Sequence, residues 1–186
     1  MRQRLAAYVL LPALAGCATA PMTMAADPPP EAPAATIVNE LVRARGGNQS
    51  ITIYLAGGED CKTVPPGRNP IYRALYRMTD DTEGAEKTRK VSALQPTRFY
   101  YQEYASGGRK CEIVADTVLL PGRTYKLRGG FTYKDGPIPM LTGVRSCRFE
   151  LVDAATGQPV MLLPRQSGAI CEGQLGDISK KLQALF

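Results

Sequence analysis

The sequence predicts a mainly β domain, an antiparallel β-sandwich or small barrel with one or two short helices, held together by two disulfides. The first observation is a succession of short β-branched and aromatic runs separated by turn signals such as Pro121-Gly122. The second is an even set of four cysteines in the same region. The third is that the sequence lacks the strand-helix-strand rhythm of a parallel sheet. Together these observations favour short strands that fold back on one another.

The chain of 186 residues divides into three regions by composition. The last region, residues 36–186, has about 150 residues, enough for a single β-rich domain with its own core. Before it, twelve of the eighteen residues 18–35 are Ala or Pro. Such a stretch buries too little apolar surface to offset the entropy of ordering it, so residues 17–35 are expected to form a tether.

The first half of the domain contains one predicted helix and two predicted strands. Thr36 caps a short helix over residues 36–47, whose apolar side chains share one face. Residues 50–58 (SITIYLAGG) and 70–78 (PIYRALYRM) alternate as half-buried strands do, and the second strand places its two tyrosines on one face. The charged residues 79–90 are expected to form an exposed loop.

The second half of the domain reads as three strand pairs and a final helical turn. Residues 90–108 give two extended pieces around Gln95-Pro96, and residues 110–133 give two longer ones around a Pro-Gly pair that suits a type II turn. Residues 146–163 read as strand, tight turn and strand, with Gly157 in a left-handed conformation. Residues 177–186 are expected to be helical.

The first sixteen residues have the order of an export signal. Arg2 and Arg4 precede an uncharged apolar run from Leu5 to Ala15. This run is about eleven residues long, shorter than the roughly 20 that a membrane-spanning helix needs. Residues 1–16 are therefore predicted to be a signal peptide that is removed.

The end of this run, Leu14-Ala15-Gly16-Cys17, resembles the lipobox of bacterial lipoproteins. The resemblance implies cleavage before Cys17 and acyl chains on that residue, so that the membrane is held through them. Ala18, in place of an aspartate, implies the outer membrane with the domain facing the periplasm, and exposure at the cell surface is also open. The alternative is an ordinary secreted protein that is cut near residues 18–20.

Loss of the two leader arginines lowers the formal charge from +6 to +4. The basic residues are scattered, and the densest group is Lys87, Arg89 and Lys90. A solvated surface explains such a distribution better than a nucleic-acid site does, so no nucleic-acid partner is expected.

Four cysteines remain once Cys17 is assigned to lipid. In an oxidising compartment, Cys61, Cys111, Cys147 and Cys171 are most simply two disulfides, for which three connectivities exist. We expect Cys61–Cys111 with Cys147–Cys171, because the second pair flanks a single predicted hairpin. The chain has no histidine and no Cys-x-x-Cys, so neither a metal site nor a cofactor is expected.

No catalytic motif is present. Without histidine, a Ser-His-Asp or Cys-His arrangement is impossible, and Ser-x-x-Lys does not occur. Carboxylates that could act on a glycan are Glu59-Asp60, Asp80-Asp81 and Glu103. Adjacent acids point to opposite sides of a strand, which makes solvated carboxylates the better interpretation.

One constellation suggests recognition, the heptapeptide RFYYQEY at residues 98–104. As a strand it places Phe99, Tyr101 and Glu103 on one face. The other face carries a candidate recognition surface made of Arg98, Tyr100, Gln102 and Tyr104, residue types enriched at binding hot spots. The plainer interpretation is that tyrosine is simply a good strand residue.

Two function classes follow from these features. The first is a lipid-anchored envelope protein that serves as a binding, assembly or inhibitor module for another envelope protein. The second is an envelope enzyme that acts on glycan or peptide through carboxylates. The absence of a catalytic motif favours the first class.

Overall fold

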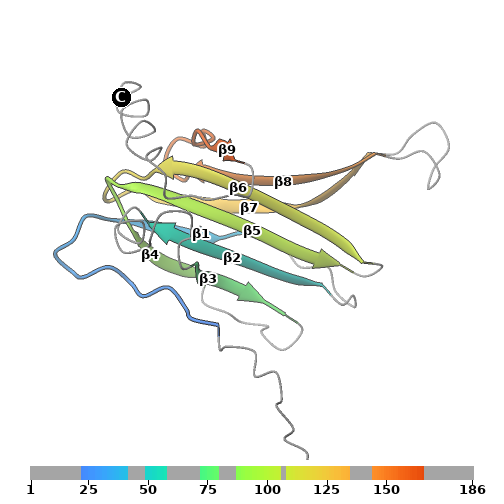
Figure 1. Ribbon diagram of the computed structural model, residues 1–186. Helices are drawn as coiled ribbons and strands as arrows, with labels where there is room; N and C mark the ends of the chain where they lie inside the picture. Colours follow the sequence, from blue (N-terminus) through green and yellow to red (C-terminus); the bar gives the residue numbers. More distant parts are fainter. Residues whose placement is uncertain are drawn as a thin grey trace, which may run out of the picture.

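Two β-sheets stacked face to face form the domain (Figure 1). The computed structural model describes residues 22–41, 49–57, 72–79, 87–105, 108–134 and 144–165. Within these residues all regular structure is strand, and neither sheet closes into a barrel. The predicted β-sandwich architecture is therefore confirmed for the part of the chain that is described, and the barrel alternative is wrong.

The first sheet has four strands in the order β4-β1-β7-β8. Their bounds are β1 Ala34–Asn39, β4 Thr88–Ser92, β7 Thr124–Lys134 and β8 Val144–Asp153. The long β7 and β8 form an antiparallel pair, and β1 pairs with β4 in the same sense. Strands β1 and β7 run parallel, so the sheet is mixed rather than wholly antiparallel.

The second sheet has five strands in the order β3-β2-β5-β6-β9, all of them antiparallel to their neighbours. Their bounds are β2 Ser50–Gly57, β3 Arg73–Met78, β5 Pro96–Ala105, β6 Arg109–Val118 and β9 Leu163–Arg165. Strand β5 lies in the middle and pairs with β2 and β6 over almost its whole length.

The core fills the space between the sheets. Every second residue of the central strands faces inward, as alternation along a strand requires. The inward set includes Ile37, Ile53, Phe99, Tyr101, Leu127 and Leu151, none of which retains measurable exposure. The Phe149 ring of β8 lies 5.5 Å from the Tyr101 ring and 6.0 Å from the Phe99 ring, so aromatic contacts join the two sheets.

The helix predicted over residues 36–47 is wrong for the residues that are described. Thr36 to Asn39 belong to β1, with Ile37 inward and Val38 half-buried on the outer side. The Asn39 side chain accepts a hydrogen bond of 3.1 Å from the Leu41 amide just after the strand ends. Strand partners on both sides satisfy the β1 backbone, so tertiary pairing overrides the local helical pattern. The domain boundary predicted at Thr36 also lies inside this strand.

Two details of residues 70–90 differ from the prediction. Opposite the step from Ile53 to Tyr54 of β2, strand β3 carries one extra residue, Leu75, and this bulge leaves Ala74, Leu75 and Tyr76 buried in succession. The two tyrosines of this segment therefore separate: Tyr76 donates to the Ile37 carbonyl in the core, whereas Tyr72 lies among the tyrosines of β2 and β5. The predicted loop 79–90 ends earlier than expected, because β4 begins at Thr88.

The turn predictions of the second half are largely confirmed. Gly122 and Gly157 both have φ of 71°, the left-handed conformation that glycine adopts without strain. The strand predicted after Gly157 forms only a bridge between Pro159 and Val152, and the chain then crosses to the other sheet as β9. The predicted terminal helix, residues 177–186, lies outside the described residues.

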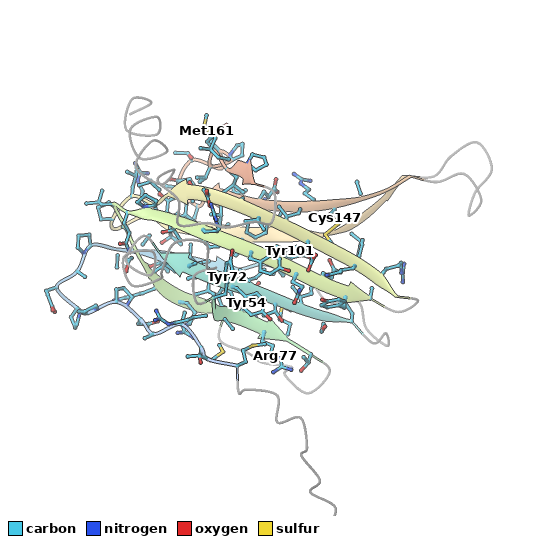
Figure 2. The ribbon with its side chains drawn as sticks, in the orientation of Figure 1. Tyr54, Tyr72, Arg77, Tyr101, Cys147 and Met161 are labelled. Atoms are coloured by element: carbon cyan, nitrogen blue, oxygen red, sulfur yellow. A yellow bond between two sulfur atoms is a disulfide. The ribbon has the colours of Figure 1, made fainter. Side chains whose placement is uncertain are left out.

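One disulfide is described, and it joins the two sheets. Cys111 of β6 bonds to Cys147 of β8, with 5.7 Å between their Cα atoms (Figure 2). The expected pairing of Cys111 with Cys61 and of Cys147 with Cys171 is therefore wrong. Stacking of the sheets brings together two strands that do not share a hairpin. Cys61 and Cys171 lie outside the described residues, so the second predicted disulfide is not tested.

We expect the double substitution Cys111→Ala/Cys147→Ala to lower the unfolding free energy. The two cysteines are 36 residues apart. Closing a loop of that length in the unfolded chain corresponds to about 3–4 kcal/mol. Urea denaturation of the variant and the oxidised wild type measures the loss. A peptide map under non-reducing conditions that joined Cys111 to Cys61 would contradict the assignment.

Candidate functional site

The outer face of the five-stranded sheet carries the candidate site. Strand β5 places Phe99, Tyr101 and Glu103 in the interior, each no more than 1% exposed, as the alternation of RFYYQEY predicts. On the opposite side, Tyr100 and Gln102 are half-buried and Tyr104 is 42% exposed. The strand thus gives one face to the core and the other to the surface.

Three tyrosines from separate segments of the chain gather on this outer face. Tyr54 of β2 lies opposite Tyr100 of β5, and their rings are stacked with centroids 5.6 Å apart. Tyr72, immediately before β3, lies 5.5 Å from the Tyr100 ring and 6.4 Å from the Tyr54 ring. Figure 2 labels Tyr54 and Tyr72 beside each other over β2 and β3. We call Tyr54, Tyr72 and Tyr100 the tyrosine cluster.

A network of polar side chains borders the tyrosine cluster. The Glu112 carboxylate accepts hydrogen bonds from the Tyr100 hydroxyl and, at 2.9 Å, from the Gln102 amide, and it pairs with the Lys110 ammonium at 2.7 Å. Burial raises the pKa of Glu112, but these three donors outweigh it and hold that pKa at about 2. Burial raises the pKa of the Tyr100 hydroxyl well above its ordinary value, and the hydrogen bond to Glu112 adds a smaller increase in the same direction. The hydroxyl therefore stays protonated and its ring stays oriented.

Tyr104 extends the face beyond this network. The Lys110 ammonium lies 5.5 Å from the centre of the Tyr104 ring, within the range of a cation-π contact. Because Tyr104 lies opposite Lys110 in the β5-β6 register, the sheet itself sets this contact. The outer face consequently offers aromatic rings and donors held at fixed positions.

Arg98 differs from its predicted role. It lies on the outer side of β5, yet it is only 4% exposed, because it forms a two-pronged ion pair with fully buried Asp116 of β6. Burial alone would lower the pKa of the guanidinium, but Asp116 raises it. Burial also raises the pKa of the Tyr72 hydroxyl, and the nearby Arg98 charge offsets part of that rise. Arg98 therefore lies near the tyrosine cluster as a buried residue and is not part of an accessible surface.

Glu103, a candidate for glycan chemistry, lies in the core. Its carboxylate accepts hydrogen bonds from the Tyr101 hydroxyl and the Gln49 amide. Burial and the bond to Glu103 raise the pKa of the Tyr101 hydroxyl far above its ordinary value. A carboxylate enclosed in this way has no access to a polymeric substrate, so Glu103 is best described as a buried polar anchor.

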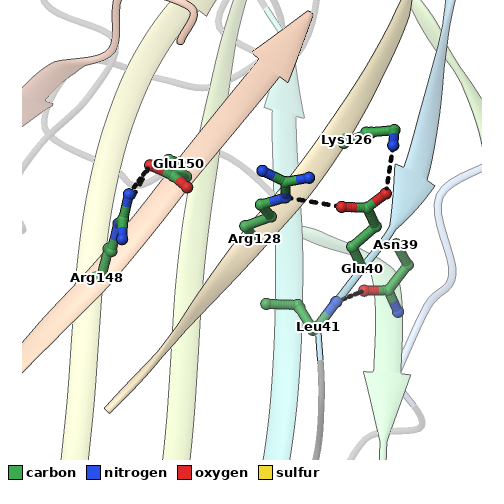
Figure 3. A network of polar contacts seen from close by, with 7 residues as sticks. All are labelled: Asn39, Glu40, Leu41, Lys126, Arg128, Arg148 and Glu150. Carbon is green, nitrogen blue, oxygen red and sulfur yellow. Dashed lines mark hydrogen bonds and ion pairs between the residues drawn. The ribbon is translucent and has the colours of Figure 1, made fainter. Parts of the chain in front are cut away.

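The outer face of the four-stranded sheet has a different character (Figure 3). Glu40, just beyond β1, pairs with Lys126 at 2.9 Å and with Arg128 at 2.7 Å, and these two partners lower its pKa. On β8, Arg148 pairs with Glu150 at 2.6 Å. Exposed pairs of this kind contribute little to stability. On this face the charged side chains neutralise one another in ion pairs, whereas the outer face of the other sheet carries aromatic rings.

Several predicted site residues lie outside the described part of the chain. They are Cys17, Cys61, Glu59, Asp60, Asp80, Asp81 and Cys171. Among the described residues, no group of three or more metal-ligating side chains is present, and no helix is long and apolar enough to cross a membrane.

Sequence reasoning found Tyr100, Gln102 and Tyr104 but missed Tyr54 and Tyr72. Tyr54 could have been found, because it occupies an outward position of the alternating run SITIYLAGG. Strict alternation misplaces Tyr72, because the bulge at Leu75 of β3 that separates it from Tyr76 shows only in the pairing of β3 with β2. Glu112 and Lys110 follow only from the pairing of β5 with β6.

Comparison with known proteins adds no family assignment: no protein family matches the chain, and no curated protein or solved structure matches it either. The class of protein is therefore defined by its own geometry. It is a two-sheet β-domain with one aromatic outer face and an inter-sheet disulfide.

We expect Arg98→Met to destabilise the domain by roughly 3–5 kcal/mol, because it removes the guanidinium that pairs with the buried Asp116 charge. The double variant Arg98→Met/Asp116→Leu should be closer to wild type, because neither charge remains. Thermal or urea unfolding of both variants measures the difference. Equal stability of Arg98→Met and wild type would contradict the buried ion pair.

Proposed function

We propose that the protein is a lipid-anchored module of the bacterial cell envelope that binds another envelope protein. Binding uses the tyrosine cluster together with Gln102 and Tyr104. Acyl chains on Cys17 hold the module on the periplasmic side of the outer membrane. In this role it assembles or inhibits its partner and performs no chemistry of its own.

The anchor is supported by the sequence. A basic start, a short apolar run and Leu14-Ala15-Gly16-Cys17 occur in the order that lipoprotein processing requires. Two or more acyl chains make membrane attachment lasting, whereas one chain binds reversibly. The disulfide between Cys111 and Cys147 is consistent with an oxidising compartment.

Protein recognition is supported by the outer face of the five-stranded sheet, the observation that carries the proposal. Tyrosine adds large contact area with little loss of side-chain entropy, and it is enriched at binding hot spots. Here the rings of Tyr54, Tyr72 and Tyr100 pack against one another, and the Glu112 carboxylate accepts a hydrogen bond from the Tyr100 hydroxyl. A pre-organised face of this kind loses less freedom on binding than mobile side chains do.

Hydrolysis of glycan or peptide by carboxylates receives less support. Glu103 is enclosed in the core, and Asp116 and Glu112 are each committed to a cation. A pair of acids that divides the roles of acid and base needs access to substrate and separate pKa values. These three carboxylates do not offer that combination.

Replacement of the acylated cysteine tests the anchor. We expect Cys17→Ser to move the protein from the membrane fraction to the soluble periplasmic fraction, because the substituted side chain cannot receive the lipid. Fractionation of cells that produce either form, followed by immunoblotting, measures the shift. Continued sedimentation of Cys17→Ser with membranes would contradict the proposed attachment.

Replacement of the outer tyrosines tests recognition. We expect Tyr100→Ser/Tyr104→Ser to reduce recovery of the crosslinked partner at least tenfold, since hot-spot tyrosines contribute 2 kcal/mol or more. Crosslinking in whole cells and mass spectrometry of the proteins recovered with the domain give the measurement. Leu94→Ser is the matched control, because Leu94 is 57% exposed and lies between β4 and β5. Unchanged recovery with the tyrosine variant, or equal loss with the control, would contradict the assignment.

A further inference from the structure

The start of the described chain is bound to the edge of the five-stranded sheet. Met24 forms a parallel bridge with Ala74 of β3. The Ala25 amide donates to the Ala74 carbonyl at 2.8 Å, and the Ala74 amide donates to the Thr23 carbonyl at 2.9 Å. The described part of the predicted tether, residues 22–35, is therefore joined to the domain from its beginning.

A second attachment lies directly after this bridge. Arg89 of β4 donates to the Ala25 carbonyl and pairs with Asp27 at 3.2 Å. The Arg89 side chain is 13% exposed and the Asp27 side chain is 55% exposed, so the ion pair itself is largely in water and adds little stability. Residues 23–27 thus contact both sheets, at β3 and at β4.

These contacts shorten the link between the domain and the lipid. Cys17 and Thr23 are six residues apart, which spans at most about 20 Å at 3.3–3.6 Å per residue. A tether free over all eighteen residues 18–35 could extend about 60 Å by the same measure. If Cys17 carries lipid, as the proposed function holds, the chain joins the described domain at the β3 edge, at most about 20 Å from the acylated residue.

The side chains at this edge suit a phospholipid surface. Met22 is 38% exposed and Met24 is 47% exposed, and both lie within seven residues of Cys17. Arg73 and Arg77 of β3 are also exposed. Flexible apolar side chains and exposed arginines along one sheet edge match the acyl boundary and the anionic headgroups of a membrane interface.

We propose that the β3 edge, with Met22 and Met24, lies against the phospholipid surface. The inference deepens the proposed function and depends on its lipid anchor. The sheet then stands edge-on to the membrane, with β9 on the far side, four strand spacings or about 19 Å from β3. Figure 2 shows Arg77 and Met161, which precedes β9, on opposite sides of the domain. The tyrosine cluster consequently faces along the plane of the membrane, where it can bind partners that lie close to the bilayer.

The protein contains no tryptophan, so a single introduced tryptophan reports its own surroundings. The test uses the full acylated protein carrying Met24→Trp, reconstituted in phosphatidylcholine and phosphatidylglycerol vesicles with brominated acyl chains. Met161→Trp is the matched control, because Met161 is 52% exposed and lies beside the opposite sheet edge. Met22→Trp provides a second reporter outside the bridge with Ala74.

We expect bromine to reduce the fluorescence of Met24→Trp and Met22→Trp at least twofold and to leave that of Met161→Trp unchanged. Equal fluorescence of all three variants in brominated and plain vesicles would overturn the inference. Mass spectrometry of the N-terminal peptide separates the two possible failures. If Cys17 is acylated but no quenching occurs, only the proposed orientation is contradicted. If the N-terminal peptide carries no acyl groups, both the lipid anchor and the orientation are contradicted.

Discussion

The position of β5 is the constraint on which the rest of the structure depends. It pairs with β2 on one side and β6 on the other, so nearly all its backbone groups are satisfied within the sheet. Its alternation sends Phe99 and Tyr101 into the core and Tyr100 and Tyr104 outward. A slip of one residue would exchange these sets, burying the outer tyrosines and exposing the core rings. One register therefore fixes both the packing of the sandwich and the composition of its candidate site.

The features that the sequence predicts well are those that depend on local alternation and turn chemistry. The two faces of residues 98–104 and the left-handed glycines at 122 and 157 need no knowledge of distant partners. The failures involve partners far away in the chain. The residues of β1 have a helical pattern locally, and the strands that pair with them, β4 and β7, lie about 50 and 90 residues downstream. The local pattern therefore predicts a helix where distant partners impose a strand. Cys111 finds Cys147 because the sheets stack, which spacing alone does not disclose.

Polar groups inside the domain serve position rather than chemistry. The Arg98-Asp116 pair is buried near Tyr72, and the Glu103 carboxylate accepts hydrogen bonds from Tyr101 and Gln49. Removing one partner from such a group leaves a buried charge or donor unsatisfied, so these contacts demand a specific arrangement of the strands around them. The strands that carry the half-buried outer tyrosines are thereby held in a fixed arrangement. Among the described residues, the acids Glu103, Glu112 and Asp116 are held in hydrogen bonds or ion pairs and the outer tyrosine rings face away from the core, which is why we propose recognition rather than hydrolysis.

The division of roles along β5 is tested most directly by residue-resolved hydroxyl-radical footprinting of the mature protein. Tyr104 is 42% exposed, whereas Tyr101 three residues earlier has no measurable exposure. We predict that Tyr104 is oxidised several times faster than Tyr101 and that the oxidation rate of Tyr100 lies between the two. Comparable oxidation of Tyr101 and Tyr104, or faster oxidation of Tyr101, would contradict the register that joins the core to the candidate site.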